Sequence, residues 1–424
     1  MPNVYVKSYG CSANTADAEI AKGMLAEHGY RVVDSPRDSD LDIVLTCVVK
    51  TPTEVKVTKH IQMLVEAGKP FIVAGCMPKA MRGRVEEVAP RASMVGPDDL
   101  GRITEAVEAS LSGGRAVFLD GGPTDRTCLP RARANRLVHI APICTGCLGD
   151  CSYCIVKRAR GRLHSFPADE IVGDVEAAVA EGCREVWVTA EDTAAYRDGA
   201  TRLPQLLDMI TSVEGRFMVR VGMMTPNQAL PLLGDLLEAY SSPKVYKFIH
   251  VPVQSGSDAV LASMRRMYRV ADFMKVIEGF RTAYQDAGVS TDIICGFPGE
   301  TKAQFEESMA LVRQLQPDVL NISRYWERPG TEAASMPGRL HGRETKARSR
   351  ALTGLWKGLA VAAGERWLGW EGDVLLTEKG KGHSKVGRNH AYKAVAVETP
   401  AELGETVRVR VTGAGVGFLE AVAV

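Results

Sequence analysis

The sequence predicts an α/β protein with three domains: an open parallel α/β domain, a partial (β/α)6 barrel and a small antiparallel β-barrel. Three observations predict this order. The chain of 424 residues is too long for a single hydrophobic core. Short apolar runs alternate with helix-like stretches in two separate series, and alternating apolar and polar residues replace them near the end. We expect these domains at residues 1–115, 137–361 and 362–424, with a linker at 116–136.

The first series begins at residue 3 and continues to about residue 90. Residues 4–10, 41–47 and 69–76 are strand-like, and helix-like residues 14–29 and 51–68 follow the first two strands. This rhythm predicts a parallel sheet with crossover helices. Ligands of such a sheet gather at the carboxyl ends of its strands.

Three cysteines occupy these carboxyl ends. Cys11, Cys47 and Cys76 each stand at the end of one strand, just before a helix begins. One such cysteine would be interpreted as a small buried apolar residue. Three at equivalent strand ends predict a metal site that the sheet topology assembles.

Residues 112–136 are rich in Gly, Pro and Arg, which is typical of a linker. Their arginines have two interpretations, contact with phosphate or a solvated basic surface. The residues concerned are Arg126, Arg131, Arg133 and Arg136.

Six βα units of about 30 to 40 residues each follow the linker and predict the partial barrel. We expect its strands within residues 137–144, 184–190, 217–224, 244–253, 289–297 and 318–325. Active residues of such barrels lie at the carboxyl ends of the strands. Those ends carry Cys147, Glu191, Asp192, Gln254, Gly296, Glu300 and Arg324.

The tail alternates apolar and polar residues between Gly-rich turns, so it predicts a small β-barrel or sandwich. We expect its strands at residues 373–380, 393–398, 405–413 and 418–424. Its basic residues indicate either a nucleic-acid contact or a solvated surface. They are Lys379, Lys381, Lys385, Arg388, Lys393, Arg408 and Arg410.

Charge and cysteine content restrict the partners and the compartment. The 52 basic and 51 acidic residues nearly cancel, so local patches would have to hold a polyanion. No apolar run approaches the roughly 18 residues that span a bilayer, so we expect a cytoplasmic protein without membrane contact. Ten cysteines without a secretory signal favour reduced thiols that bind metal or do redox chemistry.

The stretch CTGCLGDCSYC, residues 144–154, contains four of these cysteines. Cys147, Cys151 and Cys154 have the spacing C-x3-C-x2-C, which can bind three irons of a four-iron cluster and leave the fourth iron open. Cys144 would complete a C-x2-C…C-x2-C pattern, so the spacing also allows a structural zinc site.

This loop, with Tyr153 before its last cysteine, resembles the signature of radical S-adenosylmethionine (SAM) enzymes, whose partial barrel the six βα units also resemble. Further segments are similar to those of the methylthiotransferases over nearly the whole chain: SYGCSANTADAE, LTCVVKTPTE, GCMP, ICTGCLGDCSYC, HVPVQSGSD, DIICGFPGET and SRYWERPGTEAA. Residues 367–424, which include GRNHAYK, look like the RNA-binding TRAM domain of that family. CVVKTPTE and CLGDCSYCIVKRARGR most resemble the archaeal and eukaryotic branch, which modifies threonylcarbamoyladenosine beside the tRNA anticodon.

The resemblance implies two four-iron clusters, SAM and a reducing electron donor protein. Cys147, Cys151 and Cys154 would hold the cluster that cleaves SAM to methionine and a 5′-deoxyadenosyl radical, which removes the C2 hydrogen of adenine. A radical is required because no ordinary acid or base removes that hydrogen. The resemblance also implies an auxiliary cluster, which presents the sulfur that a second SAM methylates. Its ligands would be Cys11, Cys47 and Cys76.

Further residues are expected to contact SAM or the RNA. The expected SAM contacts are Tyr153, Glu191, Gln254, Ser255, Gly296, Gly299, Glu300 and Arg324. Residues 296–300 have a strand-to-helix turn as the alternative interpretation. The expected contacts with phosphates of the tRNA anticodon stem-loop are Lys157, Arg158, Arg160, Arg162, Lys385, Arg388 and Lys393. His250 is interpreted as a packing or hydrogen-bonding residue, and Cys128, Cys183 and Cys295 as core or linker thiols.

Two residues depart from the family pattern. Glu191 stands where a neutral amide is more usual, and Cys144 replaces what is commonly serine.

Three alternative functions remain: the same chemistry on another tRNA adenosine or a ribosomal-protein aspartate, a cluster-bearing RNA-binding protein without turnover, and a zinc-stapled scaffold.

Overall fold

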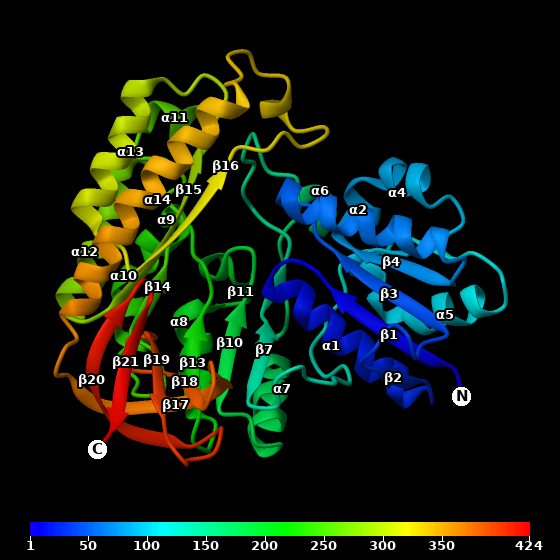
Figure 1. Ribbon diagram of the computed structural model, residues 1–424, viewed down its shortest axis with the longest axis horizontal. Helices are drawn as coiled ribbons and strands as arrows, with labels where there is room; N and C mark the ends of the chain where they lie inside the picture. The colour runs from blue at the N-terminus through cyan, green and yellow to red at the C-terminus, as the bar shows by residue number, and fades with distance from the viewer.

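The computed structural model describes all 424 residues, and its three parts follow one another along the chain (Figure 1). No helix is both long and apolar enough to cross a bilayer.

The N-terminal part is a six-stranded parallel sheet in the order β2-β1-β3-β4-β5-β6. Its strands are β1 (Asn3–Ser8), β2 (Arg31–Val33), β3 (Leu41–Thr46), β4 (Phe71–Gly75), β5 (Ser93–Val95) and β6 (Val117–Phe118). Its helices are α1 (Ser12–Glu27), α2 (Thr51–Glu66), α3 (Cys76–Ala80), α4 (Arg82–Val88), the 3-10 helix η1 (Pro97–Arg102) and α5 (Ile103–Leu111). The central strands β3 and β4 are buried at every residue, and strands buried on both faces read as continuous apolar runs.

The central part contains the six predicted parallel strands. They form two three-stranded sheets, β7-β10-β13 and β14-β15-β16, and an isolated parallel bridge between Val219 and Val245 joins the two sheets. The strands are β7 (Val138–Pro142), β10 (Glu185–Thr189), β13 (Met218–Val221), β14 (Phe248–His250), β15 (Gly288–Cys295) and β16 (Val319–Arg324). The largest apolar core of the molecule lies between these strands and their helices. The partial barrel is therefore confirmed.

Helices cover the outside of this partial barrel (Figure 1). They are α7 (Ala168–Ala180), α8 (Leu203–Ser212), α9 (Pro226–Ala229), α10 (Leu233–Ala239), α11 (Asp258–Ser263), α12 (Val270–Ala283), α13 (Lys302–Leu315) and α14 (Gly342–Glu365). Helix α6 (Val156–Arg160) instead packs against α3 of the N-terminal part. Two short hairpins, β8 (Cys144–Thr145) with β9 (His164–Ser165) and β11 (Arg197–Asp198) with β12 (Thr201–Arg202), complete it. Helix α14 continues past residue 361, where we expected the last domain to begin.

The C-terminal part is a closed five-stranded barrel in the order β17-β18-β19-β21-β20, in which only the β19–β21 pair is parallel. Its strands are β17 (Glu371–Lys379), β18 (Ser384–Arg388), β19 (Ala394–Glu398), β20 (Thr406–Gly415) and β21 (Phe418–Ala423). The small barrel expected from the tail is confirmed, with β18 as an additional strand.

This C-terminal barrel packs against the amino ends of the central strands. The hydroxyl of Tyr392 donates to Glu185 Oε1 at 3.1 Å, and Lys393 Nζ lies 2.6 Å from Asp318 Oδ1. Glu185 is the first residue of β10, and Asp318 directly precedes β16. The carboxyl ends of the same strands therefore point away from the C-terminal barrel (Figure 1).

Two of the arginines between the first two domains, Arg126 and Arg131, have buried side chains. Arg126 is 3% exposed, and its guanidinium lies 2.5 Å from Asp17 of α1. Arg131 lies 3.0 Å from Asp174 of α7, and Arg133 pairs with Glu181. Both interpretations of Arg126 and Arg131, phosphate contact and solvated linker, are therefore wrong, because these cations serve as partners of buried carboxylates between the domains.

Candidate active site between two cysteine trios

The first cysteine trio lies on the loop between β8 and α6. Cys147, Cys151 and Cys154 are partly exposed free thiols that line one cavity of about 310 Å³. The backbone N–H of Gly149 donates to Cys147 Sγ at 3.3 Å, and Arg266 Nη1 lies 3.0 Å from Cys151 Sγ. Donors aimed at sulfur stabilise thiolates, the form that binds iron.

The second trio lies at the carboxyl ends of β1, β3 and β4, as the topology predicts. Cys11 is exposed, whereas Cys47 and Cys76 are buried. Gly10 allows the first two to approach, because it has φ +114° and a Cβ there would stand 2.9 Å from Cys47 Sγ. Asn14 Oδ1 lies 3.7 Å from Cys76 Sγ.

Burial opposes ionisation of the inner thiols in both trios. It raises the pKa of Cys76 and of Cys154 to about 12. Such thiols stay protonated at neutral pH unless a bound cation stabilises the thiolate. The donor set of both trios, three closely placed thiols, fits a thiolate-bound iron–sulfur cluster.

The cavity beside Cys147, Cys151 and Cys154 is the centre of the candidate site. Four of the expected SAM contacts line it: Tyr153, Glu191, Gln254 and Arg324. Val49 and Lys50 line it from the N-terminal domain, two and three residues after Cys47. The cavity therefore lies where the two domains that carry the trios meet.

The other expected SAM contacts do not line this cavity. Ser255 is fully buried, and its Oγ accepts from the N–H of Ser257 at 3.2 Å. Glu300 accepts from the N–H of Gly296 at 2.7 Å and pairs with Arg348 at 2.7 Å. The SAM contacts predicted for Ser255, Gly296, Gly299 and Glu300 are not supported, because the polar side chains bond within the protein and both glycines shape a turn with positive φ. The strand-to-helix turn describes residues 296–300 better.

Sequence reasoning missed several residues of the cavity. His250 lines it with Asp292, and their side chains are 2.7 Å apart. The interpretation of His250 as a packing or hydrogen-bonding residue agrees with this contact, but it did not place His250 in the cavity wall. Its position at the end of β14 was the available signal. The aromatic ring of Trp326, 4.5 Å from the Arg324 guanidinium carbon, forms part of the rim.

The expected RNA contacts divide into exposed and buried residues. Arg158 and Arg162 are exposed near the cysteine loop, and Lys157 is partly exposed. Arg160 is 3% exposed and lies 2.7 Å from Asp17, and Lys393 is 8% exposed and paired with Asp318. The phosphate contacts predicted for Arg160 and Lys393 are wrong, because both cations already neutralise buried carboxylates. Lys385 bonds to backbone carbonyls, and Arg388 pairs with Glu378.

The zinc alternative requires Cys144 as a ligand beside Cys147, Cys151 and Cys154. No three His, Cys, Asp or Glu side chains converge on the position of one ion. Cys144 is 3% exposed and lines a different small cavity together with Asp17, Arg160 and Glu191. Cys183 and Cys295 are buried, in agreement with their interpretation as core thiols.

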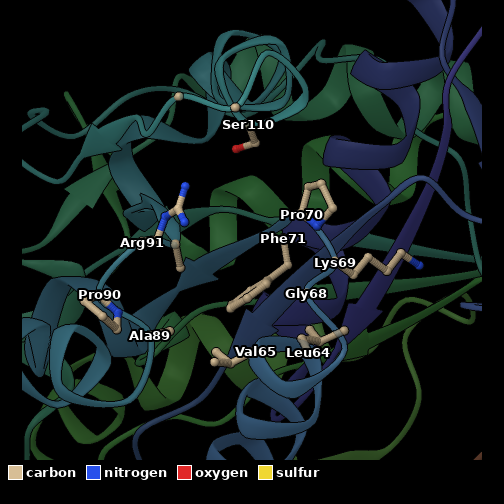
Figure 2. A pocket seen from close by; sticks show the side chains of 13 residues that line it. Leu64, Val65, Gly68, Lys69, Pro70, Phe71, Ala89, Pro90, Arg91 and Ser110 are labelled. Atoms are coloured by element: carbon tan, nitrogen blue, oxygen red, sulfur yellow. The ribbon is translucent and has the colours of Figure 1, made fainter.

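A second cavity, of about 340 Å³, lies elsewhere in the N-terminal domain. Figure 2 shows its apolar floor at Phe71, with Arg91 and Ser110 on its walls. Phe71 begins β4 and Cys76 follows the end of β4, so this cavity lies at the opposite end of the strand from the trio. It is separate from the candidate active site.

Comparisons with known proteins agree with this arrangement. Residues 141–312 match the Radical SAM superfamily, and residues 3–96 match the family described as Uncharacterized protein family UPF0004. Among solved structures, the radical S-adenosylmethionine methyltransferase TsrM from Kitasatospora setae has a similar fold, with a TM-score of 0.59 at 15% identity. That match covers 78% of this chain and 77% of TsrM.

Curated relatives match over nearly the whole chain. The probable threonylcarbamoyladenosine tRNA methylthiotransferase of Methanothermobacter thermautotrophicus is 40% identical, over 97% of each chain. The protein of the same name in Pyrococcus horikoshii is 39% identical over 90% of each chain. The human threonylcarbamoyladenosine tRNA methylthiotransferase is 36% identical over 98% of this chain and 73% of its own length. The chain therefore belongs to the threonylcarbamoyladenosine tRNA methylthiotransferase family of radical SAM enzymes.

Proposed function

We propose that this protein adds a methylthio group to C2 of N6-threonylcarbamoyladenosine, next to the anticodon of tRNA, by radical SAM chemistry. The observation that carries the proposal is the cavity between two cysteine trios. Cys147, Cys151 and Cys154 line it from the partial barrel, and Lys50 lines it from the strand end that carries Cys47. A reaction that joins sulfur to a carbon radical requires both groups near one substrate atom.

Each trio would hold one four-iron cluster. Cys147, Cys151 and Cys154 would hold the cluster that binds SAM, and Cys11, Cys47 and Cys76 would hold the auxiliary one. When bound, these groups supply the radical that takes the C2 hydrogen and the sulfur that replaces it. The protein supplies placement, which can lower a barrier by about 7 to 11 kcal/mol.

The cavity wall offers polar groups for SAM and for the base. Arg324 forms no ion pair, so its guanidinium is available for a carboxylate such as that of SAM. Tyr153, Gln254 and the His250–Asp292 pair provide further polar groups on the same wall. Gln254 has φ +71°, an uncommon conformation for a residue other than glycine, which turns the chain at the cavity.

Exposed cations would hold the tRNA without reading its sequence. Lys157, Arg158 and Arg162 follow the cysteine loop along the chain and would contact phosphates of the anticodon stem-loop. Lys379 and Lys381, exposed and without ion pairs, are better candidates in the C-terminal barrel than Lys393. A reducing electron donor protein completes the system, which we place in the cytoplasm with its tRNA.

Nucleoside analysis of tRNA from cells that lack this protein tests the proposal. We expect the 2-methylthio derivative of threonylcarbamoyladenosine to disappear and the unmethylthiolated nucleoside to accumulate. Restoring the wild-type protein should restore the derivative, and the Cys147→Ala protein should not. An undiminished 2-methylthio derivative, or the loss of a methylthio group from a ribosomal protein instead, would refute the substrate assignment.

A further inference from the structure

One short helix connects the two cysteine trios. Helix α6 begins two residues after Cys154 and ends at Arg160, and it packs against α3, which begins at Cys76. The Arg160 side chain crosses into the N-terminal domain, where Nη2 lies 2.7 Å from Asp17 Oδ2 and 2.9 Å from Asn14 Oδ1. The positive charge of Arg160, a residue of the domain that carries the first trio, is therefore buried in the N-terminal domain near the second trio.

The Asn14 amide fixes the position of this charge. Its Nδ2 donates to the carbonyls of Tyr9 at 2.7 Å and Thr46 at 2.8 Å, so Oδ1 must point the other way. Both the Arg160 guanidinium and the Cys76 thiol lie against that oxygen. The guanidinium therefore stands beside the sulfur of Cys76, in a buried place where charges interact strongly.

Glu191 is a second carboxylate close to the Arg160 guanidinium. Its Oε1 lies 3.7 Å from Arg160 Nε, and its side chain also lines the cavity beside the first trio. Asp17 cannot neutralise Arg160 alone, because it also pairs with Arg126 at 2.5 Å. Glu191 thus supplies part of the negative charge that Arg160 meets.

We propose that Arg160 is a positioning residue that raises the reduction potential of the auxiliary cluster, and that Glu191 weakens this effect from the SAM cavity. The proposal rests on the proposed function, since it requires a cluster on Cys11, Cys47 and Cys76. Reduction adds negative charge to a cluster, so a nearby cation favours the reduced form and a nearby carboxylate opposes it. The two side chains therefore act with opposite signs on one potential.

An anaerobic redox titration, monitored by electron paramagnetic resonance, tests the proposed effects of Arg160 and Glu191 on the reduction potential. The titration uses the full chain with Cys147, Cys151 and Cys154 replaced by alanine, so that only the auxiliary cluster remains. In this background we expect Glu191→Gln to shift the midpoint potential to a more positive value. Arg160→Met should shift it to a more negative value, and Arg160→Lys should lie between Arg160→Met and the parent. The matched control is Arg162→Met, an exposed arginine two residues away, which should leave the potential unchanged.

The outcomes separate this proposal from the proposed function. If the background protein binds no iron, the auxiliary cluster and with it the proposed function fail. If about four irons are bound and both variants leave the potential unmoved, or move it in the same direction, the role of Arg160 is overturned. Should Arg160→Met lose its cluster, the nearly isosteric Glu191→Gln decides alone: a positive shift supports the proposal, and an unchanged or more negative potential contradicts it.

Discussion

The guanidinium of Arg328 lies 2.5 Å from the carboxylate of Glu54, which connects the partial barrel to helix α2 of the N-terminal domain. Arg328 Nη2 also lies 2.6 Å from the hydroxyl of Thr51, at the start of the same helix. Arg328 is 2% exposed and lines the cavity between the trios. This contact therefore helps to set how far apart the two domains hold their cysteines.

We expect Arg328→Met to destabilise the interface between these domains by about 1.5 to 3 kcal/mol, because it removes two hydrogen bonds that involve a charged group. Glu54 keeps some contact with water, which limits the loss. The midpoint of thermal unfolding should fall, whereas Arg313→Met, an exposed and unpaired arginine on α13, should leave it nearly unchanged. Equal midpoints for the two variants would contradict this role of Arg328.

Substitutions in the two cysteine trios should abolish different steps of the reaction. Cys147→Ala should abolish the release of 5′-deoxyadenosine from SAM, because the SAM-binding cluster is lost. Cys76→Ala should keep that release and abolish methylthio transfer to tRNA. Chromatography of the SAM products and nucleoside mass spectrometry measure both steps, with the buried core thiol variant Cys183→Ala as the control. If the Cys147→Ala protein still released 5′-deoxyadenosine from SAM, the assignment of SAM cleavage to the first trio would be refuted.

The C-terminal barrel should bind tRNA through cations that no carboxylate neutralises. Replacing Lys379 and Lys381 by alanine should weaken binding and reduce the slope of log affinity against log salt by about two, roughly one for each lost phosphate contact. Lys275→Ala on α12, whose lysine pairs with Asp272, serves as the control. Filter binding at several salt concentrations measures the slope, and an unchanged slope would exclude these contacts.

The effect of these lysines should be larger with full-length tRNA than with an isolated anticodon stem-loop. The C-terminal barrel lies at the amino ends of the central strands, and the candidate site lies at their carboxyl ends. The eight residues of β15 alone separate these ends by about 26 Å. Equal losses of affinity for both RNAs would show that the barrel contacts the stem-loop itself.

Stability should fall in mild acid because of His139. This side chain is fully buried, and burial lowers its pKa below the ordinary value of 6.5. The unfolded chain binds a proton near pH 6.5 and the folded chain does not, so the free energy of unfolding decreases as the pH falls below about 6.5. Urea unfolding of His139→Gln should show a weaker decrease than the wild type, and the exposed His383→Gln should not. Identical pH dependence in all three proteins would contradict this.

Much of the fold could be predicted because long apolar runs reveal buried parallel strands. Strands β3 and β4 and all six central strands were found in this way. The shortest strands were missed, among them β2, β5, β6, β9, β11, β12 and β18. β18, with the sequence SKVGR, has one buried residue and no alternation, so pairing with its neighbours decides its structure.

The sequence could not predict which basic residues are exposed and which are buried in ion pairs, because the paired carboxylate is distant along the chain. Arg126 pairs with Asp17, 109 positions earlier, and Arg160 meets the same carboxylate from 143 positions away. Nothing local distinguishes these buried arginines from the exposed Arg162. In contrast, the sequence did predict that Cys11, Cys47 and Cys76 lie at one edge of the sheet. Each follows a parallel strand, and the carboxyl ends of parallel strands meet at the same edge.

Iron and acid-labile sulfide analysis of anaerobically reconstituted protein tests the central claim most directly. The account predicts about eight irons and eight sulfides per chain, falling to about four of each when Cys11, Cys47 and Cys76 are replaced by alanine. A wild-type protein that binds only about four irons, or about one zinc without sulfide, would contradict it.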